Sequence, residues 1–187
     1  HGKAPGSASS GGGRVDSALE MVNALIGVEK ATTVALVTRK AISAGALISL
    51  ACKQLVMQPI TTIGDCAPIA FTQEGPTPLG EKFQSPLRAK FRTLARRNGY
   101  PPVLAEAMVT DSMVVYRVLL DGREVFMDGQ EYQDLTPEQR DRIASKRTIV
   151  AEGELLTMDD SEARELGFSS MTATGLDDLL AQMDLSG

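Results

Sequence analysis

The sequence predicts an α/β fold built on a parallel β-sheet. Three neighbouring stretches carry this prediction: the β-branched run TTVALVT (32–38), the apolar stretch SAGALISLACK (43–53) and the run QLVMQ (54–58). They indicate a buried strand, a short buried helix and a second strand within about 25 residues, which is the size of a compact βαβ unit. Such a unit places its two strands parallel, with the helix covering one face of the sheet.

The segments on either side of this unit are interpreted in chain order. Residues 1–13 are rich in Gly, Ser and Ala, and are expected to form a loop or a disordered start. A helical pattern begins at Val15, and the apolar residues that share its face are Val15, Ala18, Met21, Val22, Leu25 and Ile26. After the unit, residues 60–81 contain many turn residues and are predicted to be a loop.

Two helices are predicted next. Ser85 is a suitable N-cap and Pro86 a suitable first helical residue. The apolar stripe of this helix is Leu87, Phe91, Leu94 and Ala95. Residues 103–109 are predicted to form a second, short helix. The basic residues between Arg88 and Arg97 are interpreted as a solvated helix face.

The second half of the chain predicts a hairpin and further helices. Residues 113–127 alternate around Asp121-Gly122, a strong signal for a β-hairpin. A helix capped by Thr136 and Pro137 is expected over 136–146. Residues 155–168 indicate a strand end and a helix stopped by Gly167, and 174–183 a last amphipathic helix with a Thr174/Asp177 capping pair.

Composition narrows the function classes. A chain of 187 residues with 43% hydrophobic residues is long enough for one domain with a true core. Its net charge of −5 argues against a nucleic-acid partner. Two cysteines and one terminal histidine are too few for a disulfide scaffold or a structural zinc site, and no carboxylate cluster is spaced for a metal. We therefore expect no metal and no cofactor.

Ser43 is the candidate for chemistry. It stands among small residues at the start of the apolar helix, where free N–H groups favour developing negative charge. A serine hydroxyl is a weak nucleophile until a base removes its proton. The usual base, histidine, occurs only as His1, so a desolvated lysine remains. Lys82 is favoured because it follows a Gly/Pro loop and precedes a helix, where a side chain can turn inward.

Two weak backbone signals support this interpretation. Residues 41–45 (AISAG) are a relaxed form of the nucleophile elbow, in which small neighbours permit a sharp strand-to-helix turn. The segment GGGR (11–14) lets backbone N–H groups approach a substrate carbonyl, as an oxyanion hole requires. Taken singly, a Gly-rich start is usually flexible, and a serine before a helix is usually only its cap.

Over roughly residues 11–185 the sequence resembles the ClpP-like (crotonase-superfamily) serine proteases. The resemblance is closest to the membrane-associated NfeD-type branch, which is related to signal peptide peptidase A. The matching pieces are GGRVDSALEMVNAL (12–25), KAISAGALISLACKQLVMQP (40–59), TTIGDCAPI (61–69) and LLTMDDSEARELGF (155–168). They follow the family's Gly-Gly segment, Ser-Ala-Gly helix, Ile-Gly loop and closing segment in order. Asp65 stands where the family has alanine after Ile-Gly.

The resemblance implies a ClpP-like parallel sheet with flanking helices and a Ser–Lys dyad. Ser43 falls on the nucleophile and Lys82 on the base. The oxyanion hole falls on Gly12 and Gly13 together with the amide of Ala44. Asp111 lies near a position where such enzymes carry an orienting acid.

The resemblance also implies how the chain is organised. Residues 1–187 are expected to be a single protease domain, lacking the first strands that precede the Gly-Gly segment in the family. Residues 112–147 are expected to be an inserted hairpin and helix that covers the site or packs against a neighbouring subunit. A homo-oligomer is expected, in an extracytoplasmic, periplasmic or membrane-associated location, with a parent protein anchored in the membrane.

The leading hypothesis is therefore a serine endopeptidase. The resemblance implies that it cleaves hydrophobic segments of membrane-associated proteins, stomatin-like partners among them. Two rival hypotheses remain open at this point. One is a binding or scaffold module that keeps the fold without catalysis. The other is a crotonase-type acyl-CoA enzyme whose Gly-Gly segment holds a thioester oxyanion.

Overall fold

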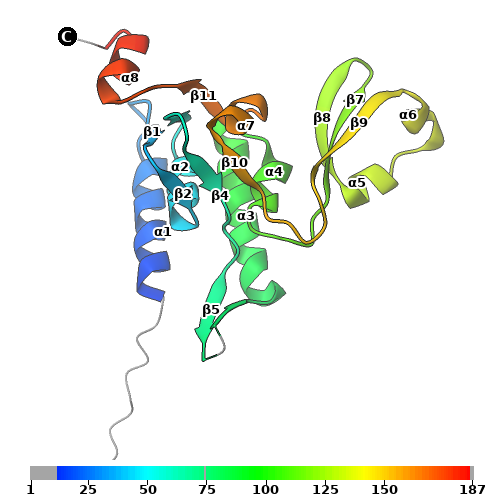
Figure 1. Ribbon diagram of the computed structural model, residues 1–187, viewed down its shortest axis with the longest axis horizontal. Helices are drawn as coiled ribbons and strands as arrows, with labels where there is room; N and C mark the ends of the chain where they lie inside the picture. The colour runs from blue at the N-terminus through cyan, green and yellow to red at the C-terminus, as the bar shows by residue number, and fades with distance from the viewer. Residues whose placement is uncertain (1–11, 74, 186–187) are drawn as a thin grey trace, which may run out of the picture.

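The computed structural model describes residues 12–73 and 75–185 (Figure 1). The helices are α1 (Gly12–Ile26), α2 (Ala44–Ala51), α3 (Glu81–Asn98), α4 (Pro102–Ala107), α5 (Gly129–Gln133), α6 (Pro137–Asp141), α7 (Asp160–Glu165) and α8 (Leu176–Gln182). The strands are β1 (Val34–Val37), β2 (Lys40–Ile42), β3 (Gln54–Met57), β4 (Thr62–Gly64), β5 (Ile69–Thr72), β6 (Gly75–Pro78), β7 (Val115–Leu120), β8 (Arg123–Asp128), β9 (Ile143–Val150), β10 (Thr157–Asp159) and β11 (Ser169–Thr172).

The predicted α/β fold with a parallel sheet is confirmed. Strands β1, β3 and β11 form a parallel sheet in the order β1-β3-β11, with Val34 opposite Gln54 and Ser169 opposite Leu55. Helix α2 lies between β1 and β3 in the chain, as a βαβ unit requires. A second sheet has the order β10-β4-β2, in which β2 is parallel and β10 antiparallel to β4. Strand β2 leads directly into α2 and thereby places the start of that helix.

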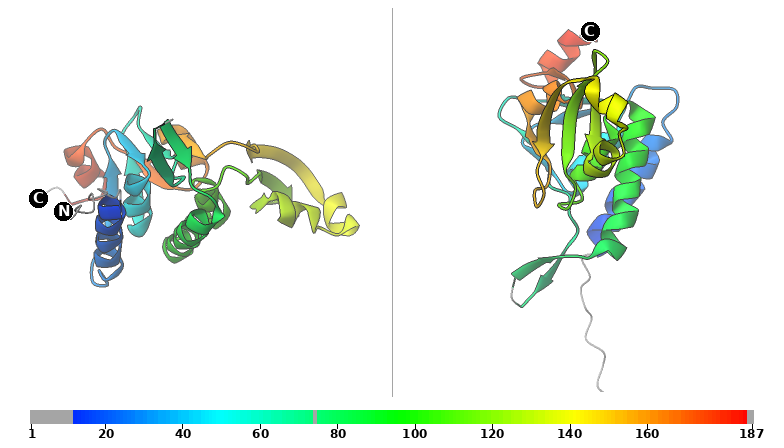
Figure 2. Two further views of the ribbon diagram at one scale, coloured as in Figure 1. Left: turned by 90° about the horizontal axis from the view of Figure 1, so that it is seen from below. Right: turned by 90° about the vertical axis from the view of Figure 1, so that its right-hand side faces the viewer.

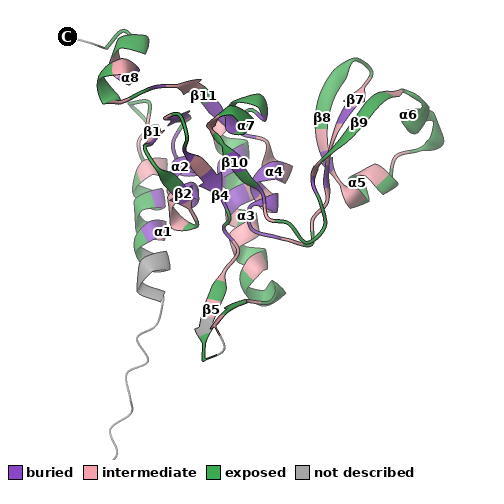
Figure 3. Ribbon diagram, in the orientation of Figure 1, coloured by how far each residue is buried: buried purple, intermediate pink, exposed green. Residues whose placement is uncertain are grey.

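Helices α1, α2 and α3 lie side by side along one face of the strands (Figures 1 and 2). Helix α2 is in the middle and packs against α1, α3 and strand β2. Its residues Ala46, Leu47, Leu50 and Ala51 are buried, so the helix is apolar nearly all round because it is enclosed nearly all round. Buried residues accordingly gather around α2, β4 and the inner sides of α3 and α4 (Figure 3).

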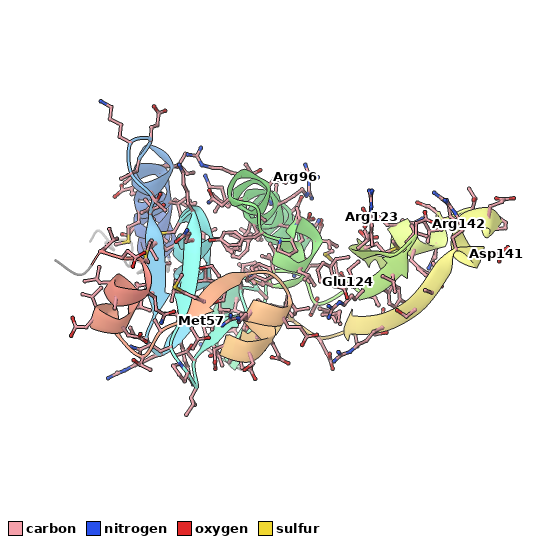
Figure 4. The ribbon with its side chains drawn as sticks, turned by 90° about the horizontal axis from the view of Figure 1, so that it is seen from above. Met57, Arg96, Arg123, Glu124, Asp141 and Arg142 are labelled. Atoms are coloured by element: carbon pink, nitrogen blue, oxygen red, sulfur yellow. The ribbon has the colours of Figure 1, made fainter. Side chains whose placement is uncertain are left out.

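The predicted insertion is a projecting three-stranded unit rather than a hairpin followed by a long helix (Figure 2). Its antiparallel sheet has the order β8-β7-β9 and carries the short helices α5 and α6. Asp121 and Gly122 turn the hairpin with φ of 52° and 75°, as a type I′ turn requires. In Figure 4 the labelled side chains of Arg123 and Arg142 lie on this unit, well apart from Met57 in the main body.

Three segment predictions were wrong. Residues 60–81 contain strands β4, β5 and β6 rather than a loop. These runs are too short to show a period, and pairing stabilises them: β4 with β2 and β10, and β5 with β6. Helix α3 begins at Glu81 after the N-cap Gly80, so Pro86 lies inside the helix. The helix beginning at Thr136 ends at Asp141, and residues 143–150 form strand β9 on β7.

Smaller differences occur near the ends of the described chain. Helix α1 begins at Gly12, three residues before the predicted start at Val15. Its inner face buries Ala18 and Val22, but Met21 is exposed. Before the last helix, the N–H and hydroxyl of Thr174 donate to the carboxylate of Asp178 instead of the predicted Asp177, and α8 begins two residues later, at Leu176. Within the described ranges, no helix is both long and apolar enough to cross a bilayer.

Candidate active site

Ser43 occupies the turn between β2 and α2 in a strained backbone conformation. Its φ is 56° and its ψ is −116°, a region that residues with a Cβ rarely adopt. Such strain costs of order 1–3 kcal/mol and persists only where the surrounding structure imposes it. The predicted sharp strand-to-helix turn is therefore present, with Ser43 at its apex.

The structure that imposes this conformation is a pair of backbone contacts. The Ser43 N–H donates to the carbonyl oxygens of Gly64 at 3.3 Å and of Asp65 at 3.2 Å. Asp65 also has a positive φ, of 46°, and its own N–H donates to the Leu156 carbonyl at 3.1 Å. Three residues of uncommon φ (Ser43, Gly64 and Asp65) therefore meet at one place, which is typical of functional sites.

Gly64 is required there by space as well as by conformation. Its φ is 133°, and a Cβ added to it would lie 2.2 Å from the carbonyl oxygen of Leu156. The close approach belongs to the pairing of β4 with β10, in which Gly64 lies opposite Thr157. Gly45, which follows the serine by two positions, is less constrained, because its added Cβ would only touch the Ala41 Cβ at 3.7 Å.

The hydroxyl of Ser43 is exposed and does not cap the helix it precedes. Ser43 makes no side-chain cap hydrogen bond, although serine is a preferred N-cap residue. Its carbonyl accepts the first hydrogen bond of the helix, from the Leu47 N–H at 3.2 Å. The N–H of Ala44 consequently has no acceptor within the helix and points to its N-terminal end, beside the hydroxyl. This arrangement places a free hydroxyl beside a helix N-terminus, where negative charge is stabilised.

Cys66 packs beneath the turn and was not predicted to contact it. Its thiol donates to the carbonyl oxygens of Gly64 at 3.2 Å and of Ser43 at 3.7 Å. Burial strongly raises the pKa of this thiol, so it remains protonated. Both Cys52 and Cys66 are buried free thiols, and burial also raises the pKa of Cys52. Neither cysteine has the exposed, electropositive surroundings of a nucleophilic thiolate.

Lys82 lies in the first turn of α3, exposed to solvent. In the part of the chain that the structure describes, the side chain of Lys82 makes no hydrogen bond with Ser43. Catalytic hydrogen bonds are often long without substrate and shorten only in the reacting complex. The structure therefore places Lys82 at the start of a helix adjacent to α2, with its side chain free to turn.

Helices α2 and α3 are joined at their C-terminal ends. The Asn98 amide donates to the Leu50 carbonyl at 2.8 Å, and the Tyr100 hydroxyl donates to the Cys52 carbonyl at 2.9 Å. These bonds satisfy carbonyls at the end of α2 that have no partner within the helix. Tyr100 is itself fixed by stacking on Phe168, with 5.9 Å between the ring centroids. The element that carries Ser43 is thus locked to the element that carries Lys82.

The other predicted site residues lie on α1 and in the segment after α4. Asp111 is half-buried after α4, and its backbone carbonyl accepts the Gly153 N–H at 2.7 Å. Among the described residues, no hydrogen bond or ion pair joins its carboxylate to Ser43 or Lys82. Gly12 and Gly13 form the start of α1, where their N–H groups lie in the first helical turn. Helix α1 packs against α2, so this turn belongs to the same layer as the serine.

The surroundings of the site leave Ser43 open. Two hollows of the described surface are lined by parts of β9, β10 and α7 and by residues around Gly99, and neither includes Ser43 or Lys82. Among the described residues, no group of three or more His, Cys, Asp or Glu is placed to hold a metal ion. The turn at Ser43 therefore presents its hydroxyl on an accessible surface.

These features define an α/β chain with the ClpP-like protease fold. Solved structures of a protein described as the membrane-bound stomatin-specific protease 1510-N have the same fold. Its serine-to-alanine mutant is 21% identical, with a TM-score of 0.61, and the match covers 89% of this chain and 62% of that one. Its lysine-to-alanine mutant with a substrate peptide is 21% identical, with a TM-score of 0.60 and coverages of 89% and 58%.

The chain belongs to the NfeD1b N-terminal domain family, whose model matches residues 8–133. It spans about 60% of the length of the solved structures that it matches. A search of the curated proteins found no match. The resemblance to NfeD-type ClpP-like proteases is thereby confirmed.

Proposed function

We propose that this chain is a serine peptidase in which Ser43 is the nucleophile and Lys82 the general base. The observation that carries the proposal is the Ser43 turn: a strained backbone that exposes a hydroxyl at a helix N-terminus without using it as a cap. A merely structural serine at this position would hydrogen-bond to the helix and would have no reason to bear the strain.

The proposed reaction uses groups on α1, α2 and α3. The amine of Lys82 accepts the proton of the Ser43 hydroxyl as the serine oxygen attacks the peptide carbonyl. The Ala44 N–H at the start of α2, with the N–H groups of Gly12 and Gly13, stabilises the oxyanion. The protonated Lys82 then donates its proton to the leaving amine, and water hydrolyses the acyl-enzyme. Asp111 is proposed as an acid that orients the lysine.

The proposal extends to substrate, assembly and location. The solved structures of the same fold are those of a protease described as stomatin-specific, one of them with a substrate peptide. We propose extended hydrophobic segments of membrane-associated, stomatin-like proteins as substrates, in an extracytoplasmic location. Residues 1–187 act as one domain, and a homo-oligomer completes the open surface around Ser43, with the unit of residues 115–150 as a contact.

The test is labelling with a fluorophosphonate probe followed by peptide mapping. Wild type is expected to be labelled at Ser43, and Ser43→Ala and Lys82→Ala are each expected to lose labelling by about a hundredfold or more. Ser49→Ala is the matched serine control, since Ser49 lies in the same helix with its hydroxyl on the Gly45 carbonyl. Lys90→Ala is the matched lysine control in α3. Full labelling of Lys82→Ala would exclude the dyad.

A second candidate function is supported by the open position of Lys82. Because the lysine does not contact Ser43 in the described structure, the chain could retain the fold as a peptide-binding module. Binding of an apolar peptide by the Ser43→Ala variant, together with no labelling of wild type at any pH between about 6 and 9, would favour this function. Cleavage of the same peptide by wild type would favour the peptidase.

A further inference from the structure

The first turn of α3, which carries Lys82, is weakly held by its own helix. Its N-cap is Gly80, which offers no side chain to the free N–H groups. Pro86 lies within the helix and has no N–H for the carbonyl of Lys82, four residues earlier. Local bonds at this turn include the Phe83 and Gln84 N–H groups on the Gly80 carbonyl, at 2.9 and 3.2 Å, and the Gln84 side-chain amide on the Leu79 carbonyl, at 2.8 Å. With no cap side chain and one helical hydrogen bond missing, contacts from elsewhere in the protein add to the stability of this turn.

Arg88 supplies that support from the following turn. Its guanidinium forms a two-nitrogen ion pair with Glu81, the residue next to Lys82, seven positions earlier in the helix. The same guanidinium donates to the hydroxyl of Thr110 at 3.0 Å. Thr110 is 2% exposed and directly precedes Asp111, so it is a fixed point in the body of the protein. The side chain of Arg88 is only 19% exposed, which limits its alternative positions.

We propose that Arg88 is a positioning residue of the site: it fixes the first turn of α3, and with it Lys82, to the Thr110–Asp111 segment. We call the Glu81–Arg88–Thr110 contacts the tether, and these contacts lie within the described structure. The effect of the tether on catalysis rests on the proposed function. An arginine suits this role because its planar fork can bind a carboxylate with two nitrogens and still reach a third acceptor. A lysine in its place would offer one point charge and could not bind the carboxylate with two nitrogens.

Arg92 provides a matched control in the same helix. It lies one turn further on and binds Glu106 of α4 with its Nε and Nη2 atoms, at 2.6 and 2.8 Å. Its ion pair is as well formed as that of Arg88, but it ties α3 to α4 beyond Pro86 and does not reach the first turn. Loss of Arg92 is thus expected to weaken the contact between the helices without freeing Lys82.

The experiment compares Arg88→Ala, Arg88→Lys and Arg92→Ala by two readouts. The first is hydrogen exchange of the segment 80–87, which needs no catalysis. Arg88→Ala is expected to accelerate it at least tenfold relative to wild type, Arg88→Lys to give an intermediate value, and Arg92→Ala to change it less than twofold. The second is the rate of fluorophosphonate labelling as a function of pH, expected to fall at least tenfold, with a shifted profile, in Arg88→Ala only.

The outcomes separate the tether from the proposed function. Equal exchange in Arg88→Ala and Arg92→Ala would overturn the tether. If wild type is labelled at Ser43, equal labelling rates and profiles in the two variants would overturn the positioning role of Arg88. If wild type is not labelled at Ser43, the proposed function fails, and the exchange comparison alone still decides whether Arg88 holds the first turn of α3.

Discussion

The backbone N–H of Ser43 donates to the carbonyl oxygen of Gly64, 3.3 Å away, and this bond joins two residues of uncommon φ. Gly64 can adopt its φ of 133° because it has no Cβ, whereas Ser43 bears its φ of 56° as strain. The conformations of the two residues therefore depend on each other. The φ of Gly64 orients its carbonyl, and the Ser43 N–H adopts its position by donating to that carbonyl.

Replacing Ser43 by glycine is expected to stabilise the protein. Relief of the strain contributes about 1–3 kcal/mol, and the greater freedom of glycine in the unfolded chain costs about 0.5–1 kcal/mol. Ser43→Gly should therefore unfold with a free energy about 1 kcal/mol higher than that of Ser43→Ala, measured by urea denaturation. An equal or lower stability of Ser43→Gly would show that the turn is not strained in solution.

Gly64→Ala and Gly45→Ala are expected to differ widely in stability. A Cβ at Gly64 would meet the Leu156 carbonyl oxygen at 2.2 Å, so β4 and β10 must separate, and a loss of about 3–4 kcal/mol is expected. A Cβ at Gly45 makes only ordinary contact with Ala41, and the better helix propensity of alanine is worth about 0.5–1 kcal/mol. Similar melting temperatures of the two variants would contradict the described packing.

The first turn of α3 is expected to loosen in acid. The hydrogen bond from Arg88 is the main cause that lowers the pKa of the Glu81 carboxyl below its ordinary value. A carboxyl with a lowered folded pKa stabilises the fold above its unfolded pKa, and that stabilisation is lost as pH falls through the folded value. Hydrogen exchange of residues 80–87, corrected for its intrinsic pH dependence, should rise over that interval. Glu81→Gln should remove the pH dependence, and an unchanged profile in this variant would rule out Glu81 as its source.

Both cysteines are expected to resist thiol reagents while the protein is folded. They are buried, and burial raises the pKa of each thiol, so the reactive thiolate is scarce and inaccessible. Reaction with a disulfide reagent in native buffer should be at least about a hundredfold slower than in denaturant. Rapid native reaction of Cys66 would show that the segment beneath Ser43 opens readily.

The projecting unit offers a test of its aromatic cluster. The Lys146 ammonium lies 3.9 Å from the ring centroids of both Tyr116 and Tyr132. Since the site is exposed, Lys146→Met should lower the free energy of unfolding by about 0.5–1 kcal/mol. Lys146→Arg should retain most of this stabilisation, because arginine keeps the cation over the rings. Equal stability of Lys146→Met and wild type would mean that the cation contributes nothing there.

The sequence could predict the Ser43 turn but not its geometry. Small residues around Ser43 and the apolar run after it indicate a strand-to-helix turn, because only small side chains fit a sharp one. The strain depends on carbonyls of Gly64 and Asp65, some twenty positions away in the chain, and no local pattern reveals such contacts. For the same reason the three-residue strands β2 and β4 depend on pairing with strands distant in the chain, β2 with β4 and β4 also with β10.

The role of Arg88 was hidden by a misplaced helix start. With α3 expected to begin at Ser85, Glu81 lay outside the helix and Arg88 was interpreted as part of a solvated face. Strand β9 was missed because ASKR is a good helix-forming string in isolation, and only its pairing with β7 makes it extended. The predicted catalytic roles stay predictions for all the site residues, namely Ser43, Lys82, Asp111, Gly12, Gly13 and Ala44.

The position of β11 constrains the order in which the chain can acquire its structure. The hydroxyl of Ser170 on this strand donates to the Leu55 carbonyl, 115 positions earlier in the chain. The β1-β3-β11 sheet can therefore be completed only after nearly the whole chain has been synthesised. The strands β7, β8 and β9, by contrast, pair with immediate neighbours within residues 115–150 and need only short loops to close. During synthesis the projecting unit can therefore form first, while β3 keeps an unpaired edge until the last strand emerges. Over that interval the open edge of β3 is exposed to pairing with other chains, a hazard that the finished fold no longer has.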